Sequence, residues 1–135
     1  MALLPRKGIL AVAAVIDIAV HAHDRPVSAK ALAVRHGLPP RHLEPVLQAL
    51  VREGILRGIR GPRGGYELAR DTSQVSADDI LRAAGTVEDA EDKRPHSKLL
   101  DDIVQPALAQ AEQAFSTALA RIKIDDMVRR VERAS

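Results

Sequence analysis

The sequence predicts a mainly helical fold with one small two-stranded hairpin and a long helix toward its C-terminal end. Apolar residues recur at helical spacing along most of the chain, and a glycine-rich turn at residues 61–64 interrupts this pattern between two short segments of strand character. The 135 residues include only two aromatic side chains, Tyr66 and Phe115, so the core must be built from aliphatic side chains and alanine. A chain of this length forms one domain, with room for an additional dimer-forming element.

Charge is unevenly distributed along the chain. The first 70 residues hold 11 Lys or Arg and 5 Asp or Glu, whereas the remaining 65 hold 9 and 13, so that +6 and −4 make up the net charge of +2. A basic first half suits a polyanionic partner such as DNA, because neutralised phosphates release counterions. The sequence contains no cysteine, which excludes disulfides, thiolate nucleophiles and cysteine-ligated metal or iron-sulfur centres.

Residues 9–21 are expected to form the first helix. Arg6 and Lys7, followed by an apolar run, superficially resemble a secretory signal, but Asp17 near the centre of the run argues against this interpretation. The run is also too short to cross a bilayer. Because it is apolar on almost every side, we expect a buried scaffold helix in a cytoplasmic protein.

Two further helices are expected to follow, separated by a tight turn. Ser28 is a good N-cap for a helix over 29–36, and Gly37 can adopt the left-handed conformation that ends it. Pro40 suits the first turn of the next helix, which is expected to run to about Glu53.

The third helix is predicted to have one buried stripe and one outward face. Pro45 removes one backbone hydrogen bond, so we expect a local kink without a break. Spacing of i, i+3, i+4, i+7 and i+8 assigns the stripe to Leu43, Val46, Leu47, Leu50 and Val51, and leaves Arg41, Glu44, Pro45, Gln48 and Arg52 facing outward.

A hairpin and a short helix come next. Segments 55–60 and 65–68 flank the glycine-rich turn, as expected for two paired strands. A helix is then expected from Ser76, where Asp79 forms a variant of the capping box, to about Gly85.

The rest of the chain is expected to pair with a second copy. Residues 86–96 are almost devoid of apolar side chains and are predicted to be a linker, which divides the chain into residues 1–85, the linker, and dimerisation helices over 97–135. Pro106 should bend the long helix early, and residues 125–132 should form a last short helix on the same interaction surface. The expected dimerisation residues are Leu100, Val104, Ala107, Ala111, Ala114, Phe115, Ala118 and Ile122.

Two short helices joined by a tight turn and followed at once by a hairpin form a winged helix-turn-helix, whose second helix can enter the major groove of DNA. In this arrangement Ser28 and its neighbouring amides can hold a phosphate, Arg41 can donate to guanine or phosphate, and Glu44 can accept from cytosine. Arg57 is expected to be a solvated surface charge. The expected DNA-contacting residues are Arg6, Lys7, Ser28, Pro40, Arg41, His42, Glu44, Gln48, Arg60 and Arg63.

The chain resembles the Rrf2 family of bacterial winged helix-turn-helix transcription regulators, which includes iron-sulfur cluster and nitric oxide sensors. The resemblance covers nearly the whole length and rests on Lys7-Gly8, on residues 26–28 and 41–44, and above all on residues 51–56 leading into residues 60–66. It implies a homodimer built by long C-terminal helices that cross between subunits. It further implies base contacts from the residues between Arg41 and Glu44, and a minor-groove contact from Arg60.

The chain departs from the family pattern at three places. Family sensors bind their cluster through three cysteines, whereas the matching segment 88–96 contains none, so a family-type iron-sulfur cluster is excluded and no small-molecule effector is identified. The usual threonine before the last helix is replaced by Ile122-Lys123-Ile124, which implies a weakly capped start. The serine that commonly caps the third helix is replaced by Pro39.

Other functions have weaker support. His21 and His23 form an i, i+2 pair with divergent directions and no evident third ligand, which favours surface or capping roles over a metal site. The sequence contains neither a nucleophile paired with a base nor a phosphate-cradling loop, so it does not indicate an enzyme. We therefore expect a dimeric repressor that binds double-stranded DNA at a palindromic operator, without a membrane partner. The alternative is a winged-helix module for protein interaction, in which the basic face is incidental.

Overall fold

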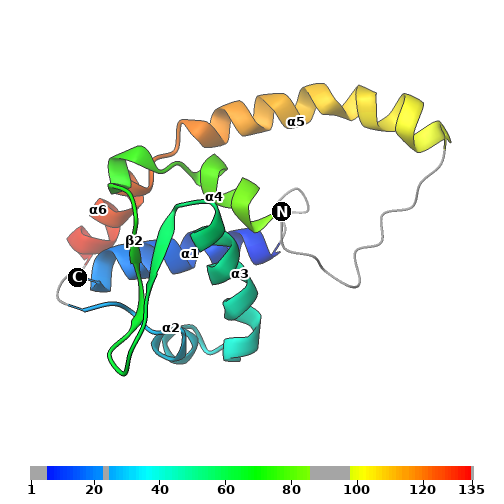
Figure 1. The fold of residues 1–135 in the computed structure, drawn as a ribbon. Helices are drawn as coiled ribbons and strands as arrows, with labels where there is room; N and C mark the ends of the chain where they lie inside the picture. Colours follow the sequence, from blue (N-terminus) through cyan, green and yellow to red (C-terminus); the bar gives the residue numbers. More distant parts are fainter. Residues whose placement is uncertain (1–5, 23–24, 86–97, 135) are drawn as a thin grey trace.

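The computed structural model describes residues 6–22, 25–85 and 98–134, and this part of the chain is mainly helical with one two-stranded antiparallel sheet. The fold is a winged helix followed by a long helix that runs along one edge of the molecule (Figure 1). The elements in chain order are α1 (Arg6–His21), α2 (Ala29–His36), α3 (Pro40–Arg52), β1 (Leu56–Ile59), β2 (Gly65–Leu68), η1 (Thr72–Gln74), α4 (Ala77–Ala84), η2 (Leu100–Val104), α5 (Gln105–Ala120) and α6 (Ile124–Ala134).

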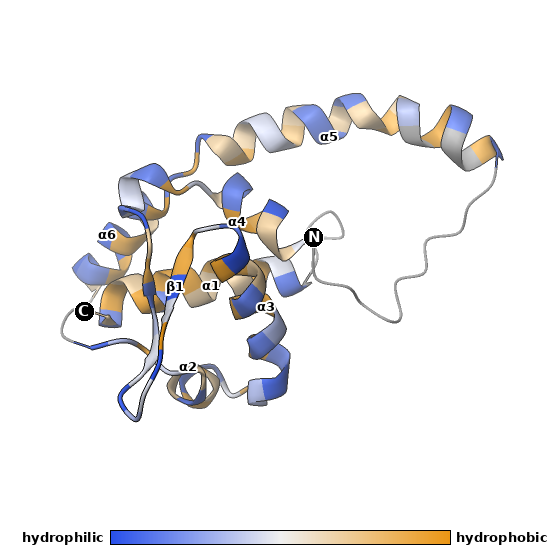
Figure 2. Cartoon of the chain, viewed as in Figure 1, coloured by the Kyte–Doolittle hydropathy of each residue, from blue (hydrophilic) through white to orange (hydrophobic). Residues whose placement is uncertain are grey.

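Helix α1 is the scaffold of the core, as expected. It contacts α3, α4, α6 and β2, and Ala11, Ala14, Val15 and Ile18 are fully buried. Figure 2 shows α1 as apolar over most of its length, whereas the outer end of α3 and the tip of the hairpin are hydrophilic. The helix begins at Arg6, three residues earlier than the apolar run indicated, so Lys7 and Gly8 lie within it.

The turn between α2 and α3 forms as the sequence predicts. The hydroxyl of Ser28 accepts a hydrogen bond of 3.0 Å from the amide of Ala31, and Gly37 ends α2 with a φ of 63°. Helix α3 begins at Pro40, which has no amide hydrogen, and it has no side-chain cap from Pro39; the His42 amide instead donates to Pro39 O at 3.0 Å.

The two faces of α3 are confirmed. Leu43, Val46, Leu47 and Leu50 are buried and Val51 is half-buried, whereas the outward residues are all exposed. The helix continues through Pro45, so the predicted absence of a break is confirmed, and Glu53 caps its end.

The predicted hairpin is also confirmed. β1 and β2 pair antiparallel, with Leu56 opposite Leu68 and Ile59 opposite Gly65. After η1, helix α4 starts in a complete capping box: Ser76 Oγ accepts from the Asp79 amide at 3.1 Å, and Asp79 Oδ2 accepts from the Ser76 amide at 3.0 Å.

The long helix changes type near its start. A π-helical turn, η2, precedes α5, and Pro106 lies in the first turn of α5. Proline has no amide hydrogen and crowds the preceding turn, so a wider turn at this position relieves the clash. The predicted linker over 86–96 lies outside the described residues.

The last helix packs differently from our expectation. We expected it to share the interaction surface of the long helix, but α6 contacts α1, and Ile124 and Val128 are buried in the same core. Its start is also held without a threonine cap, because the Ile124 amide donates to Val75 O at 2.9 Å and the Ala77 amide donates to Ile122 O at 2.8 Å. Ile124 and Val128 are four residues apart and share the buried face of α6, but this spacing alone does not show which helix covers that face.

Candidate nucleic-acid interface

The outward face of α3 presents a group of exposed polar side chains. Arg41, His42, Glu44 and Gln48 are all exposed, while the opposite side of the helix is fixed in the core. A helix held this way projects its side chains from a rigid support, which is the arrangement required to enter a DNA groove.

The wing consists of β1, β2 and the turn between them. It lies beside the outward face of α3 and is joined to it by a hydrogen bond. Gln48 Nε2 donates a hydrogen bond of 3.3 Å to the hydroxyl of Tyr66, which is in β2. This bond joins the outward face of α3 to the wing, and we call the exposed residues Arg41, Glu44, Gln48, Arg60 and Arg63 the candidate DNA-facing surface.

The wing is also fixed to the segment before α2. Val27 and Tyr66 form an antiparallel bridge in which each amide donates to the other residue's carbonyl, at 2.9 and 2.8 Å. A Cβ atom at Gly65 would lie 2.5 Å from the carbonyl carbon and oxygen of Val27, so only glycine permits this approach. Sequence analysis missed this bridge; the pair of glycines before Tyr66 was its only local sign.

Charged groups on the wing are of two kinds. Arg57 is a solvent-exposed surface charge, as expected, and it pairs at 2.9 Å with Glu67, its opposite residue in the hairpin. Arg60 and Arg63 are exposed near the tip and form no ion pair with any carboxylate of the described residues. These two guanidinium groups are therefore available to an external anion.

The remaining predicted contact residues lie at helix starts. Ser28 is half-buried, and its hydroxyl is occupied by the Ala31 amide, so a phosphate there would meet the first backbone amides rather than the hydroxyl. Pro40 is exposed at the first position of α3. Lys7 is half-buried in α1, and the side chain of Arg6 lies outside the described part.

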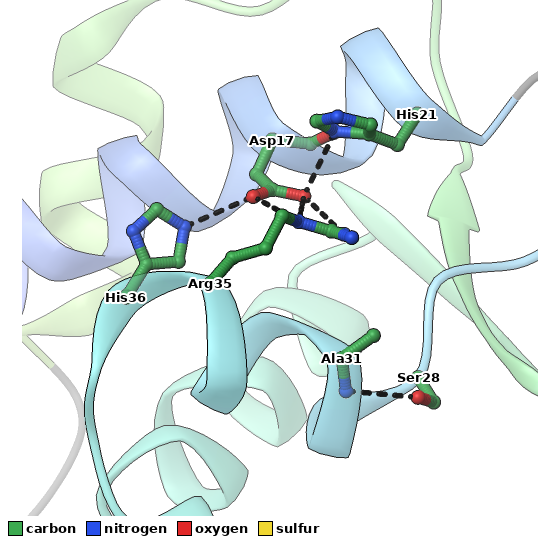
Figure 3. Close-up of polar contacts among 6 residues, drawn as sticks. All are labelled: Asp17, His21, Ser28, Ala31, Arg35 and His36. Atoms are coloured by element: carbon green, nitrogen blue, oxygen red, sulfur yellow. Dashed lines mark hydrogen bonds and ion pairs between the residues drawn. The ribbon is translucent and has the colours of Figure 1, made fainter.

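A buried carboxylate ties α1 to α2. Asp17, only 9% exposed, accepts three hydrogen bonds of 2.7 to 3.2 Å from the guanidinium of Arg35. His36 Nε2 lies 3.0 Å and His21 Nδ1 3.2 Å from the same carboxylate. Figure 3 shows the two imidazole rings on different sides of it. We call these four residues the Asp17 cluster. The sequence signal was present, because a lone acid in an apolar helix requires a cationic partner.

The Asp17 cluster stabilises the charged form of its carboxylate. Burial alone would raise the pKa of Asp17, but the hydrogen bonds and charge of Arg35, with smaller contributions from His21 and His36, outweigh it and hold the pKa below its ordinary value. Asp17 is therefore ionised at neutral pH and holds the first helix of the helix-turn-helix against the scaffold helix.

The predicted dimerisation surface is partly exposed in the chain. Ala107, Ala111, Ala114, Ala118 and Ile122 are exposed, whereas Val104 and Phe115 are half-buried, and α5 contacts α4 of its own chain. The side chain of Leu100 lies outside the described part. Sequence analysis missed three large apolar residues that are also exposed here: Leu99 at 64%, Ile103 at 61% and Leu108 at 57%.

Among the described residues, no group of three or more His, Cys, Asp or Glu side chains is placed to hold a metal ion. Within the same residues, none of the helices is both long enough and apolar enough to cross a membrane.

Comparison with known proteins identifies the family. The family model of Rrf2, described as an iron-dependent transcriptional regulator, matches residues 4–130. The chain belongs to the Rrf2 family. The resemblance noted from the residues is thus confirmed, and the family is one of transcription regulators rather than enzymes.

Individual Rrf2 relatives agree with this assignment. The HTH-type transcriptional regulator IscR of Yersinia enterocolitica is 34% identical over 87 residues, which are 64% of this chain and 53% of the relative. IscR of Serratia proteamaculans is 33% identical over 87 residues, which are again 64% of this chain and 53% of the relative. The matched stretch therefore spans about half the length of these curated relatives.

Solved Rrf2-type structures share the fold over nearly the whole chain. The structure of T. potens IscR has a TM-score of 0.73 and 30% identity, covering 98% of this chain and 90% of that one. CymR, the global cysteine regulator of B. subtilis, has a TM-score of 0.70 and 25% identity, covering 93% and 95%.

Proposed function

We propose that this chain is a sequence-specific, DNA-binding transcription regulator whose α3 enters the major groove. The observation that carries the proposal is the exposed outward face of α3, joined to the wing through Gln48 and Tyr66. Membership of the Rrf2 family supports the same function.

Individual roles follow from the chemistry of the side chains. Arg41 offers donors to guanine or phosphate. Glu44 accepts from the amino group of cytosine but is repelled by acceptor atoms on base edges, so it discriminates between bases. Arg60 reaches the minor groove, while Arg63 and the first amides of α2 contact phosphates. Lys7 and Arg6 add sequence-independent affinity.

The functional unit in this proposal is a homodimer. Residues 97–135 supply the dimerisation helices through the exposed alanines of α5, and residues 1–85 form the DNA-binding domain. The two copies of α3 in the dimer would enter successive major grooves. The operator should therefore be an imperfect palindrome whose half-sites are separated by about one helical turn or a small multiple. Occlusion of a promoter by this dimer would repress transcription.

Regulation in this proposal does not use an iron-sulfur cluster held by cysteines. The 135 residues contain no thiol to ligate one. We propose a cytoplasmic protein, because its DNA target lies there, and any signal that controls it must act through other chemistry.

The test is duplex binding as a function of salt. The protein should bind its own promoter, and the logarithm of the affinity should fall steeply and linearly with the logarithm of the salt concentration. Arg60→Ala should weaken binding by about tenfold, equivalent to 1.4 kcal/mol. Lys123→Ala is the matched control, since Lys123 is exposed just before α6, where its backbone bridges to Ser76, and is not among the predicted DNA-contacting residues.

A different result would favour a protein-interaction module. Such a module would bind a protein partner with little dependence on salt, and neither Arg60→Ala nor Arg41→Ala would change that affinity. Failure of the wild-type protein to bind duplexes recovered from genomic footprinting would contradict the DNA-binding proposal.

A further inference from the structure

A hollow of about 670 Å³ lies between the end of α1, the start of α2 and the tip of the wing. Its lining includes His21, Arg25, Ser28, Arg35 and Arg63. These residues come from three separate parts of the chain. The fold brings them together next to the candidate DNA-facing surface, with which the hollow shares Arg63.

The charge of the hollow is one-sided. Three arginines line it, Arg25, Arg35 and Arg63, and among the described residues no acidic side chain does so. Arg35 is neutralised by Asp17, with which it forms three hydrogen bonds. Arg25 and Arg63 are exposed and form no ion pair with a carboxylate of the described residues, so two positive charges are left for a ligand.

The remaining walls suit a compact oxyanion. Ser28, which caps the eight-residue helix α2, and Ala31 in its first turn line the hollow, so the positive end of the helix dipole lies on this side. Val27 and the wing also line the hollow, and the backbone bridge between Val27 and Tyr66 holds them together. The bridge therefore fixes the position of Val27 relative to β2 before a ligand arrives, which lowers the entropic cost of binding.

We propose that this hollow binds a phosphate group, held between the guanidinium groups of Arg25 and Arg63. Arg25 is a new binding residue, outside the DNA-contacting set that sequence analysis selected. The phosphate can come from the backbone of the bound duplex or from a free phosphorylated compound, and only the first source rests on the proposed DNA-binding function.

The first arm of the test uses inorganic phosphate without DNA, at constant ionic strength. Amide resonances of Arg25 and of residues 27–30 and 63–65 should shift saturably, and Arg25→Ala should weaken the phosphate affinity at least fivefold. Arg25→Lys should recover part of it, because the charge is kept while the bidentate geometry is lost. Lys123→Ala removes one exposed charge elsewhere and should leave the affinity unchanged.

The second arm uses a duplex carrying the operator. If the phosphate belongs to the DNA backbone, Arg25→Ala should reduce the slope of log affinity against log salt by about one, while the preference among base sequences stays the same. Thermal unfolding of each variant shows whether the fold is intact, and Arg25 has no partner in the described residues whose loss would destabilise it.

The outcomes separate the two sources. Saturable phosphate binding that depends on Arg25 supports a free anion, and a changed salt slope without such binding supports the DNA backbone. If Arg25→Ala alters neither, the proposal is wrong. Should the wild-type protein bind no duplex at all, the DNA-binding function fails, and the phosphate arm alone still decides whether the hollow is an anion site.

Discussion

Gln48 on the outward face of α3 donates a hydrogen bond of 3.3 Å to the hydroxyl of Tyr66 in the wing. Tyr66 is at the same time bridged through its backbone to Val27, just before α2. One residue of the wing therefore contacts both sides of the helix-turn-helix, so the relative positions of α2, α3 and the wing are coupled.

Tyr66→Phe should test the side-chain half of this coupling. The change removes the hydroxyl but keeps the ring and the backbone bridge, so the melting temperature should change by less than about 2 °C, because the bond is exposed. Affinity for the operator should fall by about two- to tenfold, since a net hydrogen bond contributes roughly 0.5–1.5 kcal/mol. Fluorescence anisotropy measures it; equal affinity for both proteins would show that Gln48 needs no support from the wing.

Gly65→Ala should test the backbone half. The added methyl group would meet the Val27 carbonyl at 2.5 Å, so the bridge must open, at a cost of about 1–3 kcal/mol in the free energy of unfolding. Gly58→Ala is the matched control within the same hairpin, because a Cβ there meets nothing within 4 Å. Urea unfolding of the two variants decides the point, and equal stabilities would mean that the bridge contributes nothing.

Asp17→Asn should lower stability in a pH-dependent way. Because the pKa of Asp17 is lowered in the folded protein, its stabilising contribution is fully present above its ordinary value of 3.8 and is lost as the pH falls through the folded pKa. The variant should lose about 1–3 kcal/mol at pH 7, and its deficit should shrink in acid. Asp126→Asn, at an exposed residue of α6, is the control. A deficit independent of pH would indicate a packing effect rather than a charge effect.

Glu44→Ala should relax base preference at one position of each half-site. Without the carboxylate, bases that do not donate to it are no longer rejected, so the preferred sequence loses at most a few-fold in affinity while substituted operators gain about 1–3 kcal/mol. Selection of binding sequences from a randomised operator measures this change. Equal effects on every sequence would mean that Glu44 does not contact a base.

Ala111→Glu should weaken the proposed dimer. The added charge would be buried in a helix interface where small residues permit close approach, so the dissociation constant should rise by at least tenfold. Ala109→Glu is a matched control, because a residue two positions away points about 200° around the helix and Ala109 is also exposed. Sedimentation equilibrium distinguishes the two; identical masses for both variants would place the interface elsewhere.

Local features of the fold were predictable from the sequence, and long-range contacts were not. Ser28, Gly37 and the apolar stripe of α3 act within a few residues, so capping preferences and helical spacing were sufficient. The pairing of Asp17 with Arg35 and of Val27 with Tyr66 depends on how separate elements pack. Spacing likewise marks the buried side of α6, but it does not specify whether another helix of the same chain or a second copy covers that side.

The π-helical turn before α5 changes which of the predicted dimerisation residues share one face near the start of the long helix. Such a turn holds one residue more than an α-helical turn, so every position beyond it is rotated by about 100° relative to an uninterrupted helix. A heptad pattern counted across this turn therefore assigns residues from different sides of the helix to one face. Deleting a single residue within Leu100–Val104 would restore the α-helical phase, and would swing Leu99 a quarter-turn or more around the axis relative to the alanines that follow.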